Sequence, residues 1–164
     1  MICLDTNVVI AVLRGQPVSV LDQFKRELPR GELALSVIAL SELRYGVANN
    51  ARREENAERL EVFLHAPITV LPFDTDDAEE AGEIRAALKQ AGAMIGAYDI
   101  LIAAQARRRS ALLVTANVGE FSRVPGLRLA DWSASWTWEQ RTRRDRATAR
   151  PGAETRDPQG FFLR

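Results

Sequence analysis

The first ten residues, MICLDTNVVI (1–10), decide the fold because a polar break follows an apolar run at once. Residues 2–4 predict a short buried strand. Asp5, Thr6 and Asn7 carry side chains that suit a helix N-terminus, and the apolar residues of 8–13 predict a helix after them. Asp5 is therefore expected at the carboxyl end of a strand, where open parallel sheets bind their ligands.

Strands and helices alternate along the rest of the chain. Short apolar runs predict further strands at 33–35, 68–71, 112–115 and 127–129. Periodicity and capping residues predict helices over 18–28, 36–48, 52–64, 74–90 and 97–109. This alternation predicts an α/β fold, a three-layer α/β/α sandwich with a short parallel sheet of four to five strands and helices on both faces.

A change of composition after Trp138 divides the chain. Five arginines fall within residues 141–150, and a polar stretch with Pro151 and Gly152 follows them. We therefore predict one domain over residues 1–135 and a flexible, arginine-rich extension over residues 136–164.

Composition limits the chemistry that this chain can perform. It has 22 basic and 22 acidic residues, so a cationic coat for nucleic acid is not expected. The single cysteine, Cys3, excludes an intrachain disulfide, and the single histidine, His65, excludes a zinc site built from several His and Cys residues. No apolar run is long enough to span a bilayer and no signal peptide is recognisable, so we expect a cytoplasmic protein without a membrane partner.

Carboxylates must then carry any catalysis, and three of them stand out by position. Asp5 follows the first strand, Glu42 lies among apolar residues of the helix 36–48, and Asp99 lies in the first turn of the most apolar helix. Asn117 and Glu120 follow the strand 112–115 in a similar way. An acid among apolar neighbours is costly to bury unless it is paired or binds a metal.

Each of these residues also has a simpler explanation. Asp5 could be only a helix cap, Asp99 could only favour the helix dipole, and Glu42 could pair with Arg44. Asn117 could be an ordinary turn residue. The acids between residues 74 and 80 are interpreted as a solvated helix start. Taken together, clustered carboxylates without histidine suit Mg²⁺ or Mn²⁺, which can activate water for phosphodiester cleavage.

Five segments, in order and at matching spacing, resemble the PIN domain. They are MICLDTNVVI (1–10), SELRYG (41–46), GAYDILIAAQA (96–106), LVTANVGEF (113–121) and the ending VPGL (124–127) with Asp131 and Trp132. The chain is most similar to the VapC-like toxins of type II toxin–antitoxin systems. Members are Mg²⁺- or Mn²⁺-dependent endoribonucleases with a parallel sheet between helices.

The resemblance implies roles for particular residues. Asp5, Glu42 and Asp99 match the three acidic metal ligands, with Asp5 and Asp99 expected to bind the metal closely and Glu42 through water. Asn117 stands where many PIN domains carry a fourth catalytic acid. Side chains expected to line the pocket or support the ligands are Thr6, Asn7, Thr115 and Glu120. The basic residues considered as RNA contacts are Arg14, Arg44 and Arg107 to Arg109.

The resemblance also implies partners and a biological role. Such toxins inhibit translation and growth by cutting RNA, commonly form homodimers, and are neutralised by a cognate VapB-like antitoxin. Operator DNA would be bound only through the antitoxin. By resemblance, the antitoxin packs against the helices predicted at 18–28 and 52–64.

Two other functions compete with this one. The first is a catalytically silent PIN-like module that only binds RNA or protein, against which the intact acids argue. The second is a phosphotransfer domain, either a receiver or a haloacid-dehalogenase-like phosphatase. That phosphatase pattern needs an aspartate two residues after the first one, where this chain has Asn7. A receiver needs a phosphoacceptor aspartate at the end of a middle strand, and none is found there.

Overall fold

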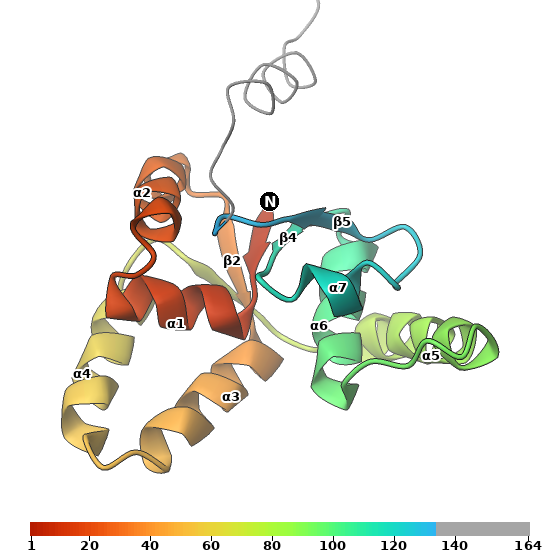
Figure 1. The fold of residues 1–164 in the computed structure, drawn as a ribbon, viewed down its shortest axis with the longest axis horizontal. Coiled ribbons are helices and arrows are strands. Elements are labelled where there is room, and N and C mark those ends of the chain that lie inside the picture. The colour runs from red at the N-terminus through yellow and green to blue at the C-terminus, as the bar shows by residue number, and fades with distance from the viewer. Residues whose placement is uncertain (134–164) are drawn as a thin grey trace, which may run out of the picture. The chain divides into compact units, whose positions relative to one another are not determined.

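The computed structural model describes residues 1–133, which form a five-stranded parallel sheet with helices packed around it (Figure 1). The strand order is β3-β2-β1-β4-β5, with all neighbours parallel. The strands are β1 (Ile2–Leu4), β2 (Leu33–Ser36), β3 (Thr69–Leu71), β4 (Leu112–Val114) and β5 (Arg128–Ala130). All five predicted strands are therefore confirmed. The extension predicted at 136–164 lies outside the described residues.

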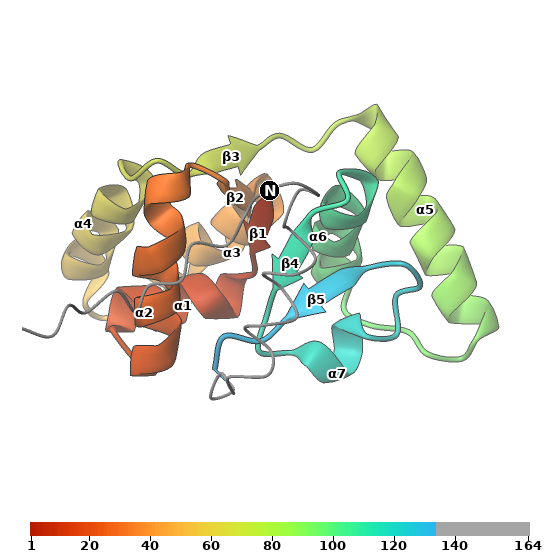
Figure 2. The ribbon, with the colours of Figure 1, turned by 90° about the horizontal axis from the view of Figure 1, so that it is seen from above.

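Helices cover both faces of this sheet, which confirms the predicted α/β/α sandwich. In chain order they are α1 (Thr6–Arg14), α2 (Val18–Glu27), α3 (Val37–Ala48), α4 (Arg53–Leu64), α5 (Thr75–Gln90), α6 (Ala97–Arg108) and α7 (Val118–Phe121). The connections from β1 to β2 and from β2 to β3 cross the sheet in one direction, and the connection from β3 to β4 crosses it in the opposite direction. Right-handed crossovers in opposite directions place their helices on opposite faces. Figure 2 shows α1, α2 and α4 on one side of the strands and α5 and α6 on the other.

Capping residues set the helix starts as the sequence predicts. The Ser36 hydroxyl accepts a hydrogen bond from the Ile38 backbone N–H at 3.0 Å, and Asp74 forms a capping box with Asp77. Two details differ from prediction. Helix α2 ends at Glu27 and passes into a 3-10 turn, η1 (Leu28–Arg30), because Pro29 has no backbone N–H with which to continue the helical hydrogen bonds. The short helix α7 was not predicted.

The central strands are buried on both sides, which fixes the sheet in the core. Leu4, Leu35 and Leu113 are fully shielded from solvent. Cys3 lies in the same layer, and burial raises the pKa of its thiol to about 12. Cys3 is therefore a buried residue without a reactive thiolate. Among the helices of residues 1–133, none is long and apolar enough to cross a membrane.

A buried ion network joins the start of α5 to the end of α6, and it corrects one prediction. Asp77 belongs to the acidic run interpreted as solvated, yet its side chain is fully buried. Its carboxylate accepts hydrogen bonds from Arg108 Nε at 2.7 Å and from both terminal nitrogens of Arg109. Arg107 is held in turn by Glu80 and by the backbone carbonyl of Pro125. These arginines hold α5 against α6, so their predicted role as phosphate contacts has no support in the structure.

Candidate active site at the carboxyl edge of the sheet

The candidate site lies where the chain leaves the two central strands in opposite directions. Strands β1 and β4 are neighbours, but β1 leads to β2 on one side and β4 to β5 on the other. Such a switch point is the usual ligand site of an open parallel sheet. Asp5 follows β1 and Thr115 follows β4, and the Asp5 backbone N–H donates to the Val114 carbonyl at 3.0 Å. The backbone therefore fixes both residues at one edge.

Asp5 is a buried carboxylate held by three donors. One oxygen accepts from the Thr6 backbone N–H at 2.8 Å, and the other accepts from the Thr115 hydroxyl at 2.7 Å. The Asn7 carboxamide adds a long contact of 3.5 Å. Burial raises the pKa of Asp5, opposed by the bonds from Thr115 and Thr6, and the Glu42 charge raises it further. Asp5 does cap α1, but capping alone does not explain its burial beside other acids.

Glu42 is tied to the same site through Thr6. The Thr6 hydroxyl donates to Glu42 Oε2 at 2.5 Å, which links the start of α1 to the middle of α3. The alternative pairing of Glu42 with Arg44 is wrong, because Arg44 forms an ion pair with Glu61 instead. Both members of that pair are about half exposed, so a contact between Arg44 and RNA stays a prediction.

Asp99 experiences the charges of every other acid at this edge. Burial raises the pKa of Asp99 to about 6, reinforced by the negative charges of Asp5, Glu120 and Glu42. A hydrogen bond with Glu120 raises the pKa of Asp99 as well. The N-terminus of α6 by itself would lower this pKa. Burial and repulsion therefore outweigh the helix dipole in setting the pKa of Asp99.

Gly96 is a contributor that the sequence did not single out. It precedes the first residue of α6, and a Cβ atom there would lie 2.8 Å from Asp99 Oδ2. The backbone φ of −55° suits any residue, so this glycine is needed for space and not for conformational freedom. The absence of a side chain lets the Asp99 carboxylate fold back over the start of its helix.

Asn117 and Glu120 complete the edge on the side of β4. The Asn117 backbone N–H donates to the Thr115 hydroxyl at 2.9 Å, and the Thr115 hydroxyl in turn donates to Asp5. The Asn117 carboxamide makes no hydrogen bond to a residue within 1–133 and is half-buried. Glu120 reaches Asp99, while Asn117 is placed near the acids through the backbone alone. The catalytic role of Asn117 stays a prediction.

The donor set consists of carboxylate and amide oxygens, which suits a hard divalent cation. No three Asp, Glu, His or Cys side chains within the described range are already arranged around one ion position. Asp5 and Glu42 are instead occupied by hydroxyl donors, and Asp99 by Glu120. A cation would offset the mutual repulsion of these acids, and its binding would replace the contact between Asp99 and Glu120.

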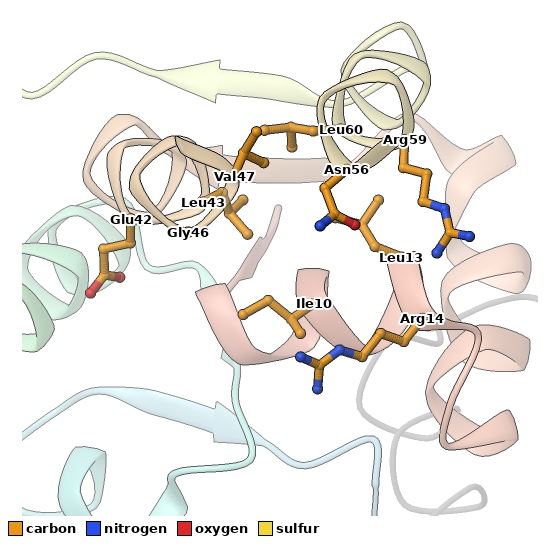
Figure 3. A pocket seen from close by; sticks show the side chains of 10 residues that line it. All are labelled: Ile10, Leu13, Arg14, Glu42, Leu43, Gly46, Val47, Asn56, Arg59 and Leu60. Atoms are coloured by element: carbon orange, nitrogen blue, oxygen red, sulfur yellow. The ribbon is translucent and has the colours of Figure 1, made fainter. Parts of the chain in front are cut away.

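An apolar groove extends from the site between α1, α3 and α4 (Figure 3). Its walls are formed by aliphatic side chains, namely Ile10, Leu13, Leu43, Val47 and Leu60. Figure 3 shows Glu42 at one end of the groove, the guanidinium group of Arg59 at the other, and the Arg14 side chain reaching toward Ile10. Arg14 is exposed and forms no ion pair within residues 1–133, so it remains available to a phosphate or to a partner. No residue of α2 lines the groove.

With the geometry known, comparison with other proteins decides the family. Residues 2–127 match the sequence model of the PIN domain. The chain belongs to the PIN-domain family. This PIN domain is 40% identical over 130 residues to the tRNA(fMet)-specific endonuclease VapC of Shigella flexneri, covering 79% of this chain and 96% of that protein. It is 36% identical over 129 residues to ribonuclease VapC2 of Rickettsia felis, with the same coverage of both chains.

Solved structures agree with this assignment. The PIN domain superimposes on VapBC2 of Rickettsia felis bound to a DNA fragment from its promoter, with a TM-score of 0.75 and 35% identity. That match covers 80% of this chain and 99% of the other. The DNA-bound VapBC of Salmonella typhimurium gives a TM-score of 0.74 at 36% identity, with the same coverage. The fold and the family expected from the sequence are thus confirmed.

Proposed function

We propose that this PIN domain is an endoribonuclease that acts as the toxin of a toxin–antitoxin pair. The observation that carries the proposal is the convergence of Asp5, Glu42 and Asp99, with Glu120, at the switch point of the sheet. Relatives that align over nearly their whole length are named ribonucleases and endonucleases. RNA phosphodiester bonds are therefore the substrate, and cutting them inhibits translation and growth.

We propose Mg²⁺ as the cofactor, with Mn²⁺ able to replace it. Asp5 and Asp99 would hold the metal directly and Glu42 through water. When bound, such an ion lowers the pKa of a coordinated water and stabilises charge on a phosphoryl oxygen. Thr115 and Thr6 keep the oxygens of Asp5 and Glu42 in fixed orientations by donating hydrogen bonds to them. With a pKa of about 6, Asp99 is largely ionised at neutral pH, and the ionised form is the one that can serve as a ligand.

The groove offers a place for the cognate VapB-like antitoxin. Its aliphatic walls suit an apolar face, and a segment lying in it would end beside Glu42 and block the site. Two solved relatives are VapBC complexes bound to DNA, so operator DNA would be contacted through the antitoxin. We include a homodimer and a cytoplasmic location in the proposal. Packing of the antitoxin against α2 stays a prediction, whereas α4 contributes directly to the groove.

RNA cleavage by the purified protein tests the proposal. The protein should cut RNA in Mg²⁺ or Mn²⁺ buffer and stop when EDTA is added. Addition of the cognate antitoxin should suppress the same activity. The alternative, a catalytically silent module, predicts RNA or protein binding without cleavage and without measurable binding of Mn²⁺ in calorimetry.

Gly96→Ala should impair cleavage without harming the fold. The added Cβ would fall 2.8 Å from Asp99 Oδ2, so the carboxylate must shift from its position. A misplacement of about 1 Å at a catalytic group costs on the order of a hundredfold in rate. The matched control is Gly82→Ala in α5, where a Cβ meets no atom within 4 Å. Equal loss of activity in both variants, or in neither, would refute the role of Gly96.

The stability of the metal-free protein should fall as pH rises toward neutrality. The pKa of Asp99 is raised from 3.8 to about 6 in the folded protein, so the folded state holds this proton more tightly than the unfolded chain. The stability contributed by the protonated form is complete below pH 3.8 and is lost as pH rises through about 6. Thermal unfolding of wild type and Asp99→Asn in EDTA, from pH 4 to 8, measures this. The variant should lack this component of the pH dependence. Parallel curves of stability against pH for wild type and variant would exclude a contribution from Asp99.

A further inference from the structure

Both tyrosines of the chain lie beside the acids of the site, and both are exposed. The chain contains two tyrosines, Tyr45 and Tyr98, whose exposed fractions are 71% and 60%. The other aromatic side chains within residues 1–133 are buried or half-buried: Phe24, Phe63, Phe73, Phe121 and Trp132. A single exposed apolar side chain needs no explanation. The positions of Tyr45 and Tyr98 do need an explanation, because each tyrosine is close in sequence to a different acid of the site.

Both tyrosines occupy helix positions close to acids of the site. Tyr45 follows Glu42 by three residues in α3, so the two share a helix face. Tyr98 directly precedes Asp99 in the first turn of α6. Helices α3 and α6 contact each other, and the charges of Glu42 and Asp99 interact. Each of these two helices therefore carries one exposed tyrosine within a turn of an acid of the site.

The electrostatics of the site favour stacking over charge as a means of holding RNA. Acids crowd the edge, and Arg44 forms an ion pair with Glu61. Arg14, which forms no ion pair within residues 1–133, lines the neighbouring groove. Without a metal, the acids themselves offer no attraction to a phosphate. An aromatic ring binds the face of any unpaired base whatever the charge nearby, and the tyrosine hydroxyls form no hydrogen bonds within the described part of the chain.

We propose that Tyr45 and Tyr98 bind the RNA substrate by stacking on unpaired bases next to the phosphodiester bond that is cut. This inference rests on the proposed ribonuclease function and adds a structural requirement to it, since only unpaired bases offer a free face. Tyr45 and Tyr98 thus select single-stranded segments such as loops and leave paired stems unbound.

Binding measured without cleavage tests the inference independently of catalysis. The probes are a stem–loop RNA and a fully paired duplex of matched length, titrated in EDTA against wild type and single tyrosine variants. Tyr45→Ala and Tyr98→Ala should each weaken stem–loop binding roughly tenfold or more, as expected for loss of one stacked base. Tyr45→Phe and Tyr98→Phe keep the ring and should bind like wild type. The control Val62→Ala removes another exposed apolar side chain, 75% exposed on α4, and should have no effect.

A spectroscopic signal separates stacking from a merely structural role. 2-Aminopurine at the unpaired positions should lose fluorescence on binding wild type and both phenylalanine variants, and keep it with the alanine variants. In Mg²⁺, the alanine variants should raise KM more than they lower kcat. Loss of binding in the phenylalanine variants as well, or normal RNA binding in the alanine variants, would overturn the proposal.

Two further results keep this inference apart from the proposed function. If wild type binds the stem–loop through the tyrosines but cuts no RNA in any metal, stacking holds and the nuclease proposal fails. If the alanine variants bind and cut RNA normally but no longer self-associate or bind the antitoxin, the tyrosines belong to a protein interface and the stacking proposal is wrong.

Discussion

Asp99→Asn should abolish RNA cleavage while the protein remains folded. The amide has the same size as the carboxylate but lacks the charge that holds a divalent cation. Loss of a group that merely supports a metal ligand costs 10- to 100-fold, so loss of a ligand should cost at least about a hundredfold. Asp5→Asn should give the same result, because Asp5 is the buried acid at the centre of the site. Initial rates of RNA cleavage in Mg²⁺ measure both.

The control for this experiment is an acid of the same domain that lies away from the site. Glu79→Gln replaces an exposed acid of α5 and should leave the rate unchanged. Because the Asp99→Asn protein is purified in the same way, its inactivity also excludes a contaminating nuclease. Cleavage by Asp5→Asn and Asp99→Asn at the wild-type rate would remove these residues from the mechanism.

Asp77→Ala should be among the most destabilising substitutions in the domain. Asp77 is fully buried and accepts hydrogen bonds from Arg108 and Arg109. Removing one partner from a buried ion network costs about 3–5 kcal/mol, because the remaining charges lose their compensation. Urea unfolding measures the loss. The matched control is Asp76→Ala, whose carboxylate also contacts Arg108 but is 69% exposed, so the cost should be about 0–1 kcal/mol.

The pH dependence of this network follows from the state of Asp77. Burial alone would raise the pKa of Asp77, but hydrogen bonds from Arg109, the Asp74 backbone and Arg108 hold it at about 2. The network's stabilisation is therefore complete above the ordinary value of 3.8 and is lost as pH falls toward 2. Equal destabilisation by Asp76→Ala and Asp77→Ala would show that burial adds nothing to this interaction.

Much of the fold could be predicted because local chemistry and tertiary packing agree. The strand at 2–4 is short and wholly apolar, and Ser36 caps the following helix as its side chain predicts. The position of Asp5 at a strand end follows from the same logic, since the carboxyl ends of parallel strands meet at one edge. These features depend on sequence neighbours, which a single sequence displays directly.

Other features depend on partners distant in the chain and could not be read locally. Asp77 looks like one of several acids at a helix start, and only its contact with Arg108 and Arg109 from α6 explains its burial. Thr6 was expected to support the site, but its bond to Glu42 spans 36 positions of sequence. Gly96 looks like an ordinary residue before a helix until the Asp99 carboxylate is placed over it. A glycine three residues before a candidate acid at a helix start is the signal that could have indicated it.

The most direct test of the metal assignment is an anomalous difference map from a crystal soaked in Mn²⁺. We expect strong anomalous density bonded to carboxylate oxygens of Asp5 and Asp99, with Glu42 connected to it through water. The metal assignment would be wrong if the protein cleaves RNA in Mn²⁺ but its soaked crystal shows no peak at these acids, or shows Mn²⁺ bound elsewhere.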